Sequence, residues 1–218
     1  MTETVTIIDY GSGNLRSVQK AVERAAQECG RDVRAVVTDD AEIVRRSDRL
    51  ILPGVGAFRA CADGLKSRAG LFDALNEAVR ENGRPFLGVC VGMQLLADVG
   101  LEHGETPGFG WIPGVVRPLA ASDADGGDIR IPHMGWNTVS FQPGHALFDA
   151  VPAESDFYFA HSFYFDVKNE KDIRGICRNG AAFPAAAARD NVAACQFHPE
   201  KSQAAGLALI AAFLDWRP

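Results

Sequence analysis

The sequence predicts an α/β fold, in which a mostly parallel sheet is flanked by helices and a small antiparallel segment is added in the second half. Strand-like and helix-like segments alternate through the first half of the 218 residues, which is the pattern of a parallel sheet covered on both faces. From about 110 to 165 the sequence becomes rich in Gly, Pro and aromatic residues with short apolar runs, which favours antiparallel strands. The length suits one domain over residues 1–218.

The elements of the first half are predicted from local signals. A β-branched run at 5–9 predicts a strand that ends in a glycine-rich turn. After Asn14, which can cap a helix, apolar residues recur at helical spacing up to Gly30. The same signals predict strands at 33–37, 50–52 and 85–89, and helices at 41–46, over 71–79 and starting at 93–97.

The second half carries weaker signals. Short apolar runs at 115–116 and 157–159 are expected to be strands, and the acidic, glycine-containing stretch at 123–128 is expected to be a loop tip. The sequence then predicts a strand at 193–197, a His-Pro turn, and a last helix from Gln203 to Asp215.

Composition excludes several classes of function. The net charge of −6 argues against a nucleic-acid partner, because phosphate neutralisation needs clustered Lys and Arg. No stretch reaches the roughly 18 to 20 apolar residues of a membrane span, and the start shows no basic region of a signal peptide, so we expect no membrane contact and a cytoplasmic location. The five cysteines form no CxxC pair, and no phosphate-binding glycine fingerprint occurs. The sequence therefore indicates neither a metal nor a cofactor.

The segment Gly88-Val89-Cys90-Val91-Gly92 has the form G-x-C-x-G between a predicted strand and a predicted helix. This is the nucleophile-elbow pattern with Cys in place of Ser. A side chain at either glycine would collide with neighbouring backbone, and the helix start behind Cys90 would stabilise a thiolate. The amide of Val91 would point to where an oxyanion forms. The competing interpretation is a glycine-rich turn with an incidental cysteine.

A base and its orienting group follow the last predicted strand. His198 and Glu200 are two residues apart, so extended backbone projects both to the same side, and Pro199 stiffens the link between them. A carboxylate on one imidazole nitrogen leaves the other free to take a thiol proton. His133 and His161 are rival bases, but neither has a carboxylate at suitable spacing, and a structural or binding role fits them better.

A second glycine-containing loop follows the strand at 50–52. Gly54, Val55 and Gly56 lie in the sequence Pro53-Gly54-Val55-Gly56, where two glycines let backbone amides turn toward a ligand. This loop could supply a second oxyanion donor. A plain strand-to-helix turn is the equally open alternative.

Taken together, the segments at 88–94 and 197–200 resemble those of class I glutamine amidotransferases. The segments at 8–15, 52–58, 131–137 and 198–202 narrow the resemblance to the glutaminase subunits of imidazole glycerol phosphate synthases. Pro132-His133-Met134-Gly135-Trp136-Asn137 is the most discriminating of them. The resemblance runs nearly end to end, and it implies a flavodoxin-like fold in one type 1 amidotransferase domain.

The resemblance also implies roles for individual residues. Cys90 would form a γ-glutamyl thioester, and His198, oriented by Glu200, would shuttle the proton. Val91 and the loop at 53–56 would supply oxyanion amides. The groups expected to hold L-glutamine are Gln94, Glu102 and the backbone around His161, Ser162 and Phe163.

In this family the released ammonia passes to a cyclase partner with a (β/α)₈ barrel fold, so the resemblance implies a heterodimer that works in histidine biosynthesis. Trp136 and Trp111 are candidates for the interface, although a place in the chain's own core is the alternative for Trp111. Three other functions remain open: the glutaminase of another ammonia-channelling synthase, an inactive binding protein within a synthase, and a free-standing hydrolase of γ-glutamyl peptides.

Overall fold

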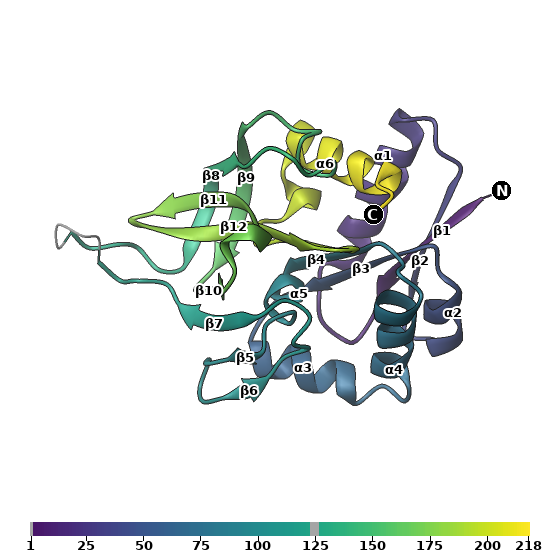
Figure 1. Ribbon diagram of the computed structural model, residues 1–218, viewed down its shortest axis with the longest axis horizontal. Helices are drawn as coiled ribbons and strands as arrows, with labels where there is room; N and C mark the ends of the chain where they lie inside the picture. Colours follow the sequence, from purple (N-terminus) through teal and green to yellow (C-terminus); the bar gives the residue numbers. More distant parts are fainter. Residues whose placement is uncertain (1, 123–126) are drawn as a thin grey trace.

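A computed structural model of the protein describes residues 2–122 and 127–218. Its main sheet has nine strands in the order β2-β1-β3-β4-β13-β12-β11-β8-β9 (Figure 1). The first five of these are parallel to one another, as the alternating pattern of the first half predicts. They are β1 (Glu3–Ile8), β2 (Val33–Thr38), β3 (Arg49–Gly54), β4 (Phe86–Cys90) and β13 (Val192–Cys195).

The other half of the sheet is antiparallel and comes from the second half of the chain. Its strands are β8 (His133–Phe141), β9 (Glu154–His161), β11 (Ile173–Asn179) and β12 (Ala181–Arg189). A separate four-stranded sheet has the order β10-β7-β5-β6. It comprises β5 (Val99–Gly100), β6 (Thr106–Pro107), β7 (Gly114–Pro118) and β10 (Phe163–Val167). The prediction of antiparallel strands in this region is confirmed.

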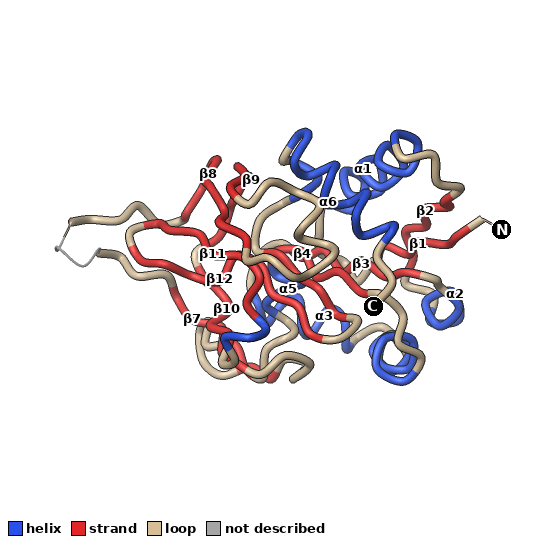
Figure 2. The backbone as a smooth tube through the Cα atoms, turned by 45° about the horizontal axis from the view of Figure 1, so that its top comes forward, coloured by secondary structure: helices blue, strands red, loops and turns tan. Residues whose placement is uncertain are grey.

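Helices cover both sides of the parallel half (Figure 2). Two lie together on one side, α1 (Leu15–Glu28) and α6 (Gln203–Asp215), and the others are α2 (Ala41–Arg46), α3 (Phe58–Lys66), α4 (Leu71–Asn76) and α5 (Val91–Gln94). A π-helical turn, Glu77–Glu81, continues α4, and short 3₁₀ turns occupy Glu170–Asp172 and Pro199–Lys201. Within the described residues, none of the helices is long and apolar enough to cross a membrane.

Three local predictions need correction or remain untested, and several elements have no counterpart in the sequence analysis. The helix predicted to start at 93–97 is the single turn α5, because the backbone carbonyls of residues 95–97 accept hydrogen bonds from the amides of 109–112 rather than from a following helical turn. No segment was predicted for helix α3 or for strands β5, β6, β8, β10, β11 and β12. Asn14 occupies the N-cap position of α1, but its side chain makes no capping bond. Of the expected loop tip, 123–126 lie outside the described residues, and Ser122 and Asp128 on either side form an isolated antiparallel bridge.

The parallel register brings three segments to one edge of the sheet. Gly54 at the end of β3 lies opposite Cys90 at the end of β4, and Cys195 at the end of β13 lies opposite Val89. Ligands of open α/β sheets bind at this carboxyl edge. The sequence-predicted nucleophile, the loop after β3 and the His-Pro turn after β13 therefore meet here.

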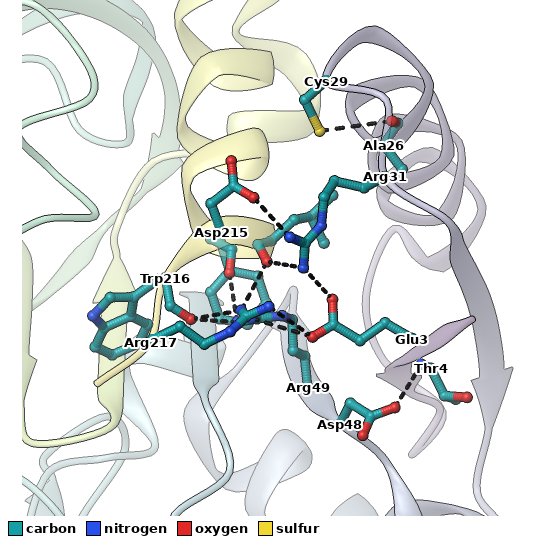
Figure 3. A network of polar contacts seen from close by, with 12 residues as sticks. Glu3, Thr4, Ala26, Cys29, Arg31, Asp48, Arg49, Asp215, Trp216 and Arg217 are labelled. Atoms are coloured by element: carbon teal, nitrogen blue, oxygen red, sulfur yellow. Dashed lines mark hydrogen bonds and ion pairs between the residues drawn. The ribbon is translucent and has the colours of Figure 1, made fainter. Parts of the chain in front are cut away.

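The opposite edge of the sheet ties the two ends of the chain together (Figure 3). Arg49, which is almost fully buried, donates to the carbonyls of Phe213 (2.7 Å) and Trp216 (2.8 Å), and its other terminal nitrogen lies 3.4 Å from the Glu3 carboxylate. Arg217 contacts the same carboxylate at 3.2 Å. A buried guanidinium is tolerated only when charge and hydrogen-bond partners are supplied, so these contacts fix the end of α6 against β1 and β3.

Candidate active site

Cys90 sits in a backbone conformation that is unusual for a residue with a side chain, with φ of 56° and ψ of −112°. Such strain is typical of functional turns. The flanking glycines are required by packing, as the G-x-C-x-G pattern suggests. A Cβ on Gly88 would lie 2.6 Å from the Gly92 carbonyl oxygen, and one on Gly92 would overlap the Leu52 carbonyl. The elbow thus holds the sulfur at the carboxyl edge of the sheet.

His198 and Glu200 form a buried pair directly after β13. The Nδ1–H of His198 donates to the Glu200 Oε1 over 2.9 Å, and the two side chains are only 4% and 1% exposed. This bond leaves Nε2 for Cys90. Burial lowers the pKa of His198, but the hydrogen bonds that its ring makes with Cys90 and Glu200 outweigh that effect and raise the pKa to about 9. At neutral pH the imidazole is therefore protonated.

Gln196 completes the surroundings of the sulfur and was given no role from the sequence. It is fully buried, and its Nε2 donates to the Cys90 Sγ over 3.7 Å. Its Oε1 accepts from the Nε2 of Gln94 at 3.0 Å, and that nitrogen also donates to the Phe163 carbonyl at 3.0 Å. The available signal was a polar side chain immediately after a run of buried apolar residues, which is rare unless the group is hydrogen-bonded.

These groups line a cleft of about 340 Å³, a size that suits a small molecule. Its lining comprises Val55, Gly56, Cys90, Val91, Gln94, Glu102, Pro132, Met134, Ala160, His161, Ser162, Phe163, His198 and Lys201. Every residue predicted to bind or react is in this set except Gly54 and Glu200. Gly54 packs beneath the elbow, where a Cβ would lie 2.9 Å from the Gly92 nitrogen, and Glu200 lies behind His198.

The loop after β3 is held in one orientation by Ser12. The Val55 N–H donates to the Ser12 Oγ over 3.1 Å, and the same hydroxyl donates to the Val55 carbonyl over 2.6 Å. The Tyr10 hydroxyl donates to the Pro53 carbonyl, two residues before Val55, over 2.7 Å. The Val55 amide is thus engaged outside the cleft. Val91, by contrast, is the first residue of α5, where a backbone N–H has no partner within the helix.

One carboxylate in the cleft is positioned by backbone. The Oε2 of Glu102 accepts a hydrogen bond from the Phe58 N–H at 2.7 Å, at the start of α3. The fixed carboxylate gives the cleft a site for a positively charged amino group. Helix α3, absent from the prediction, is therefore part of what builds the site.

The rival bases His133 and His161 are bonded to each other at 3.0 Å and not to Cys90. Burial lowers the pKa of His133, and burial lowers that of His161 to about 3. Both rings are therefore neutral at physiological pH, and neither has the carboxylate partner of His198. The structural or binding role expected for them fits this arrangement.

The two candidate interface tryptophans have different environments. Trp111 is 6% exposed, and its indole N–H donates to the Asn76 Oδ1 at 3.1 Å, so it belongs to the core. Trp136 is 49% exposed and its neighbour Met134 is 65% exposed. Met134 lines the cleft, and Trp136 lies two residues further along β8, so this strand presents two large apolar side chains to solvent.

Comparison with known proteins agrees with this geometry. Residues 6–215 match the family model of glutamine amidotransferase class-I. The chain is 50% identical over 216 residues to the imidazole glycerol phosphate synthase subunit HisH of Caulobacter vibrioides, and the match covers 99% of this chain and 100% of that protein. It is 49% identical to the subunit of the same name from Brucella suis over 217 residues, with 98% and 99% covered.

Solved structures support the fold. A crystal structure of a glutamine amidotransferase superposes with a TM-score of 0.70 at 21% identity and covers 97% of each chain. A glutamine amidotransferase from Thermotoga maritima gives a TM-score of 0.63 at 15% identity, covering 99% of this chain and 84% of its own. These matches confirm the predicted class I amidotransferase fold, with helices flanking a mixed sheet.

Proposed function

Because the chain belongs to the class-I glutamine amidotransferase family, we propose that it is the glutaminase subunit of an imidazole glycerol phosphate synthase. The observation that carries the chemistry is the buried group of Cys90, His198 and Glu200 at the cleft. The observation that supports this particular synthase is that subunits of that name are 49% and 50% identical to the chain over nearly its full length.

The first step is attack of the Cys90 sulfur on the carboxamide carbon of L-glutamine. The new C–S bond pushes the carbonyl electron pair onto oxygen, and His198 gives its Nε2 proton to the leaving nitrogen. The C–N bond then breaks, ammonia leaves, and a γ-glutamyl thioester remains on Cys90. The raised pKa of His198 supports this role, because the ring carries the proton to be donated at neutral pH.

Water resolves the thioester in the second step. His198, neutral after giving up its proton, removes a proton from water while the oxygen attacks the thioester carbon. The C–S bond breaks, the thiolate returns to Cys90, and glutamate departs. Glu200 fixes the ring throughout by accepting from Nδ1, so that Nε2 faces the reacting atoms.

Two backbone amides stabilise the oxyanion formed in each step. We assign one to Val91 at the start of α5, and the second to the loop containing Gly54, Val55 and Gly56. The Val55 amide can bind the oxyanion only after its peptide rotates away from Ser12, because the Ser12 Oγ accepts its hydrogen bond in this structure. The glycine at 56, with φ of +92°, gives the loop the conformational freedom for such a turn.

The rest of the cleft recognises the amino-acid end of glutamine. The Glu102 carboxylate attracts its ammonium group, and Gln94 with the backbone of His161, Ser162 and Phe163 forms the adjoining wall. No metal or cofactor takes part in this scheme.

The ammonia is delivered to a cyclase subunit in a heterodimer that makes imidazole glycerol phosphate and aminoimidazole carboxamide ribonucleotide for histidine biosynthesis. Exposed Met134 and Trp136, next to the cleft, are residue types enriched at interface cores. We place this reaction in the cytoplasm, where the five free thiols would stay reduced.

The test is co-purification with the cyclase subunit of the same organism, followed by assay with glutamine and the nucleotide substrate. We expect a stable complex that forms glutamate and imidazole glycerol phosphate in equal amounts. Cys90→Ala should abolish glutamate formation and leave assembly intact, and cyclisation should recover when ammonium salts are supplied. Formation of a complex with a different ammonia-using synthase, and none with the cyclase, would assign the chain to that synthase.

A further inference from the structure

Two buried histidines connect the surface strand β8 to the wall of the cleft. His133 on β8 and His161 on β9 are direct cross-strand partners, and the Nδ1 of His133 lies 3.0 Å from the Nε2 of His161. Beyond them, the Asn137 amide nitrogen lies 3.1 Å from the Nε2 of His133, and the Nδ1 of His161 lies 2.8 Å from the Phe163 carbonyl. We call this series, from Asn137 to Phe163, the histidine link.

The Asn137 end fixes the direction of the bonds. The Oδ1 of Asn137 accepts from the Thr138 N–H at 2.8 Å, which identifies the other amide atom as nitrogen. That nitrogen donates to the Arg178 carbonyl at 2.8 Å, and its second proton points to His133. The Nε2 of His133 must therefore accept, and the proton of a neutral ring resides on Nδ1 and is donated to His161.

The Phe163 end demands the same direction independently. A carbonyl can only accept, so the proton of His161 resides on Nδ1 and its Nε2 is an acceptor. That nitrogen is the atom that faces the Nδ1–H of His133. Both ends thus agree on one arrangement, in which both rings are neutral and both protons are on Nδ1. A second proton on either ring would set two donors against each other.

Packing keeps the link dry and rigid. His133 stacks on Phe159 with ring centres 4.7 Å apart, and the edge of Phe183 contacts both imidazoles. Both histidines are buried, and burial lowers the pKa of His161 to about 3. The neutral state required by the bonding pattern is therefore the one that this environment favours.

The link ends on a carbonyl that also belongs to the proposed active site. The Phe163 carbonyl accepts from His161 and from Gln94, and Gln94 continues through Gln196 to the Cys90 sulfur. Loss of either donor would let this carbonyl shift, because a single hydrogen bond does not fix its orientation.

We propose that His133 is a positioning residue for glutamine binding, which acts through the histidine link to hold the Phe163 carbonyl and Gln94 in the wall of the cleft. This inference rests on the proposed glutaminase function. His133 itself does not line the cleft, so it would act on substrate only through His161.

The experiment compares three variants in the full-length chain. His133→Phe keeps a ring against Phe159 and removes both nitrogens. His133→Asn retains an amide donor near the position of Nδ1 and serves as the conservative rescue. Asn137→Asp, at a partly exposed site, replaces the donor to Nε2 by an acceptor and so reverses the required direction of the link.

Labelling of Cys90 by a diazo-ketone analogue of glutamine reports binding and reaction separately. For His133→Phe we expect the half-saturating concentration to rise about tenfold, with the maximal labelling rate within about twofold of the unsubstituted chain. Iodoacetamide, which needs no glutamine site, should label Cys90 at an unchanged rate. His133→Asn should lie within about threefold of the unsubstituted chain for half-saturation. An unchanged half-saturation in His133→Phe would overturn the proposal.

Nitrogen-15 NMR tests the link even if a variant at His133 does not fold. The unsubstituted chain should show both histidines neutral with the proton on Nδ1, and Asn137→Asp should move the proton of His133 to Nε2 and raise half-saturation by the analogue. A proton on Nε2 of either ring in the unsubstituted chain would refute the link. Failure of the analogue to label the unsubstituted chain would instead refute the glutaminase proposal.

Discussion

The two walls of the cleft differ in how their polar groups are held. The triad wall consists of Cys90 and His198 with Gln196 and Glu200 behind them. It is buried, and its hydrogen bonds orient the groups around the sulfur. The loop wall, formed by Ser12 and residues 53–56, is partly exposed, with Val55 at 44%, and its bonds lead away from the cleft. The first wall is arranged for reaction, whereas the second has its amide engaged elsewhere.

The difference suggests where glutamine hydrolysis is controlled. A buried triad has few alternative arrangements, whereas the exposed peptide at Val55 can change orientation mainly at the cost of its two hydrogen bonds with the Ser12 hydroxyl. We therefore expect substitutions in the triad wall to remove activity and those in the loop wall to tune it.

The largest effect should come from Glu200→Gln. The amide cannot serve as a charged acceptor for the Nδ1–H of His198, so the ring loses its orientation, and its pKa loses the part of the increase that Glu200 adds to that of Cys90. We expect kcat for glutamine hydrolysis to fall about a thousandfold. Glu102→Gln, at the other carboxylate of the cleft, is the matched control and should act mainly on KM. Equal effects of both variants on kcat would contradict the assigned roles.

The second largest effect should be on the free energy of unfolding. It is tested by placing a Cβ on one glycine of the elbow and on one glycine of the loop wall. A Cβ at residue 92 would overlap the Leu52 carbonyl, so Gly92→Ala should destabilise the protein by about 3 kcal/mol or prevent folding. At Gly56 a Cβ meets open space, and only the positive φ opposes it, so Gly56→Ala should cost about 1 kcal/mol. Urea unfolding measures the loss of stability in both variants. Similar losses would show that the backbone of the elbow is packed no more tightly than that of the loop.

A third test is the pH dependence of thioester formation. His198 must be protonated to donate to the leaving nitrogen, and its pKa is raised to about 9, so the proton is present below that pH and lost above it. The rate should fall about tenfold for each pH unit above about 9. Presteady-state measurement of ammonia release, which accompanies thioester formation, gives this limb directly. A decline already centred near pH 6.5 would mean that the contacts with Cys90 and Glu200 do not hold the proton.

The smallest effect should come from Ser12→Ala, which leaves the Val55 peptide with a weak bond from the Cys61 thiol to its carbonyl. Removing two hydrogen bonds from the resting orientation should raise glutamine hydrolysis by the isolated chain about fivefold. Ser17→Ala removes a hydroxyl bonded to Asn14 in the same region and should leave the rate unchanged. If hydrolysis falls in Ser12→Ala, the hydroxyl supports the active orientation rather than the resting one.

Local signals in the sequence predicted the triad wall better than the loop wall. Cys90 has a motif, and His198 and Glu200 are close in sequence. The prediction of extended backbone between these two residues is wrong, because a 3₁₀ turn over Pro199–Lys201 brings their side chains together instead. Ser12 and Val55 are separated by 43 residues, and no spacing rule joins them. The early end of α5 also depends on residues distant in sequence. The carbonyls of 95–97 accept hydrogen bonds from the amides of 109–112, which no local pattern predicts. No spacing rule pointed to Gln196. Its buried amide joins Gln94 to the Cys90 sulfur, which only the folded structure shows.

The fastening of Glu3 to Arg49 and Arg217 has a practical consequence. Both ends of the chain are anchored at the amino edge of the parallel strands, whereas the cleft opens at their carboxyl edge. An affinity tag, a fluorophore or a fused protein attached to either terminus therefore begins on the far side of the sheet from the catalytic sulfur. Removal of the last few residues, in contrast, would remove the contacts of Trp216 and Arg217 that fix the end of α6, and it should lower the stability of the protein.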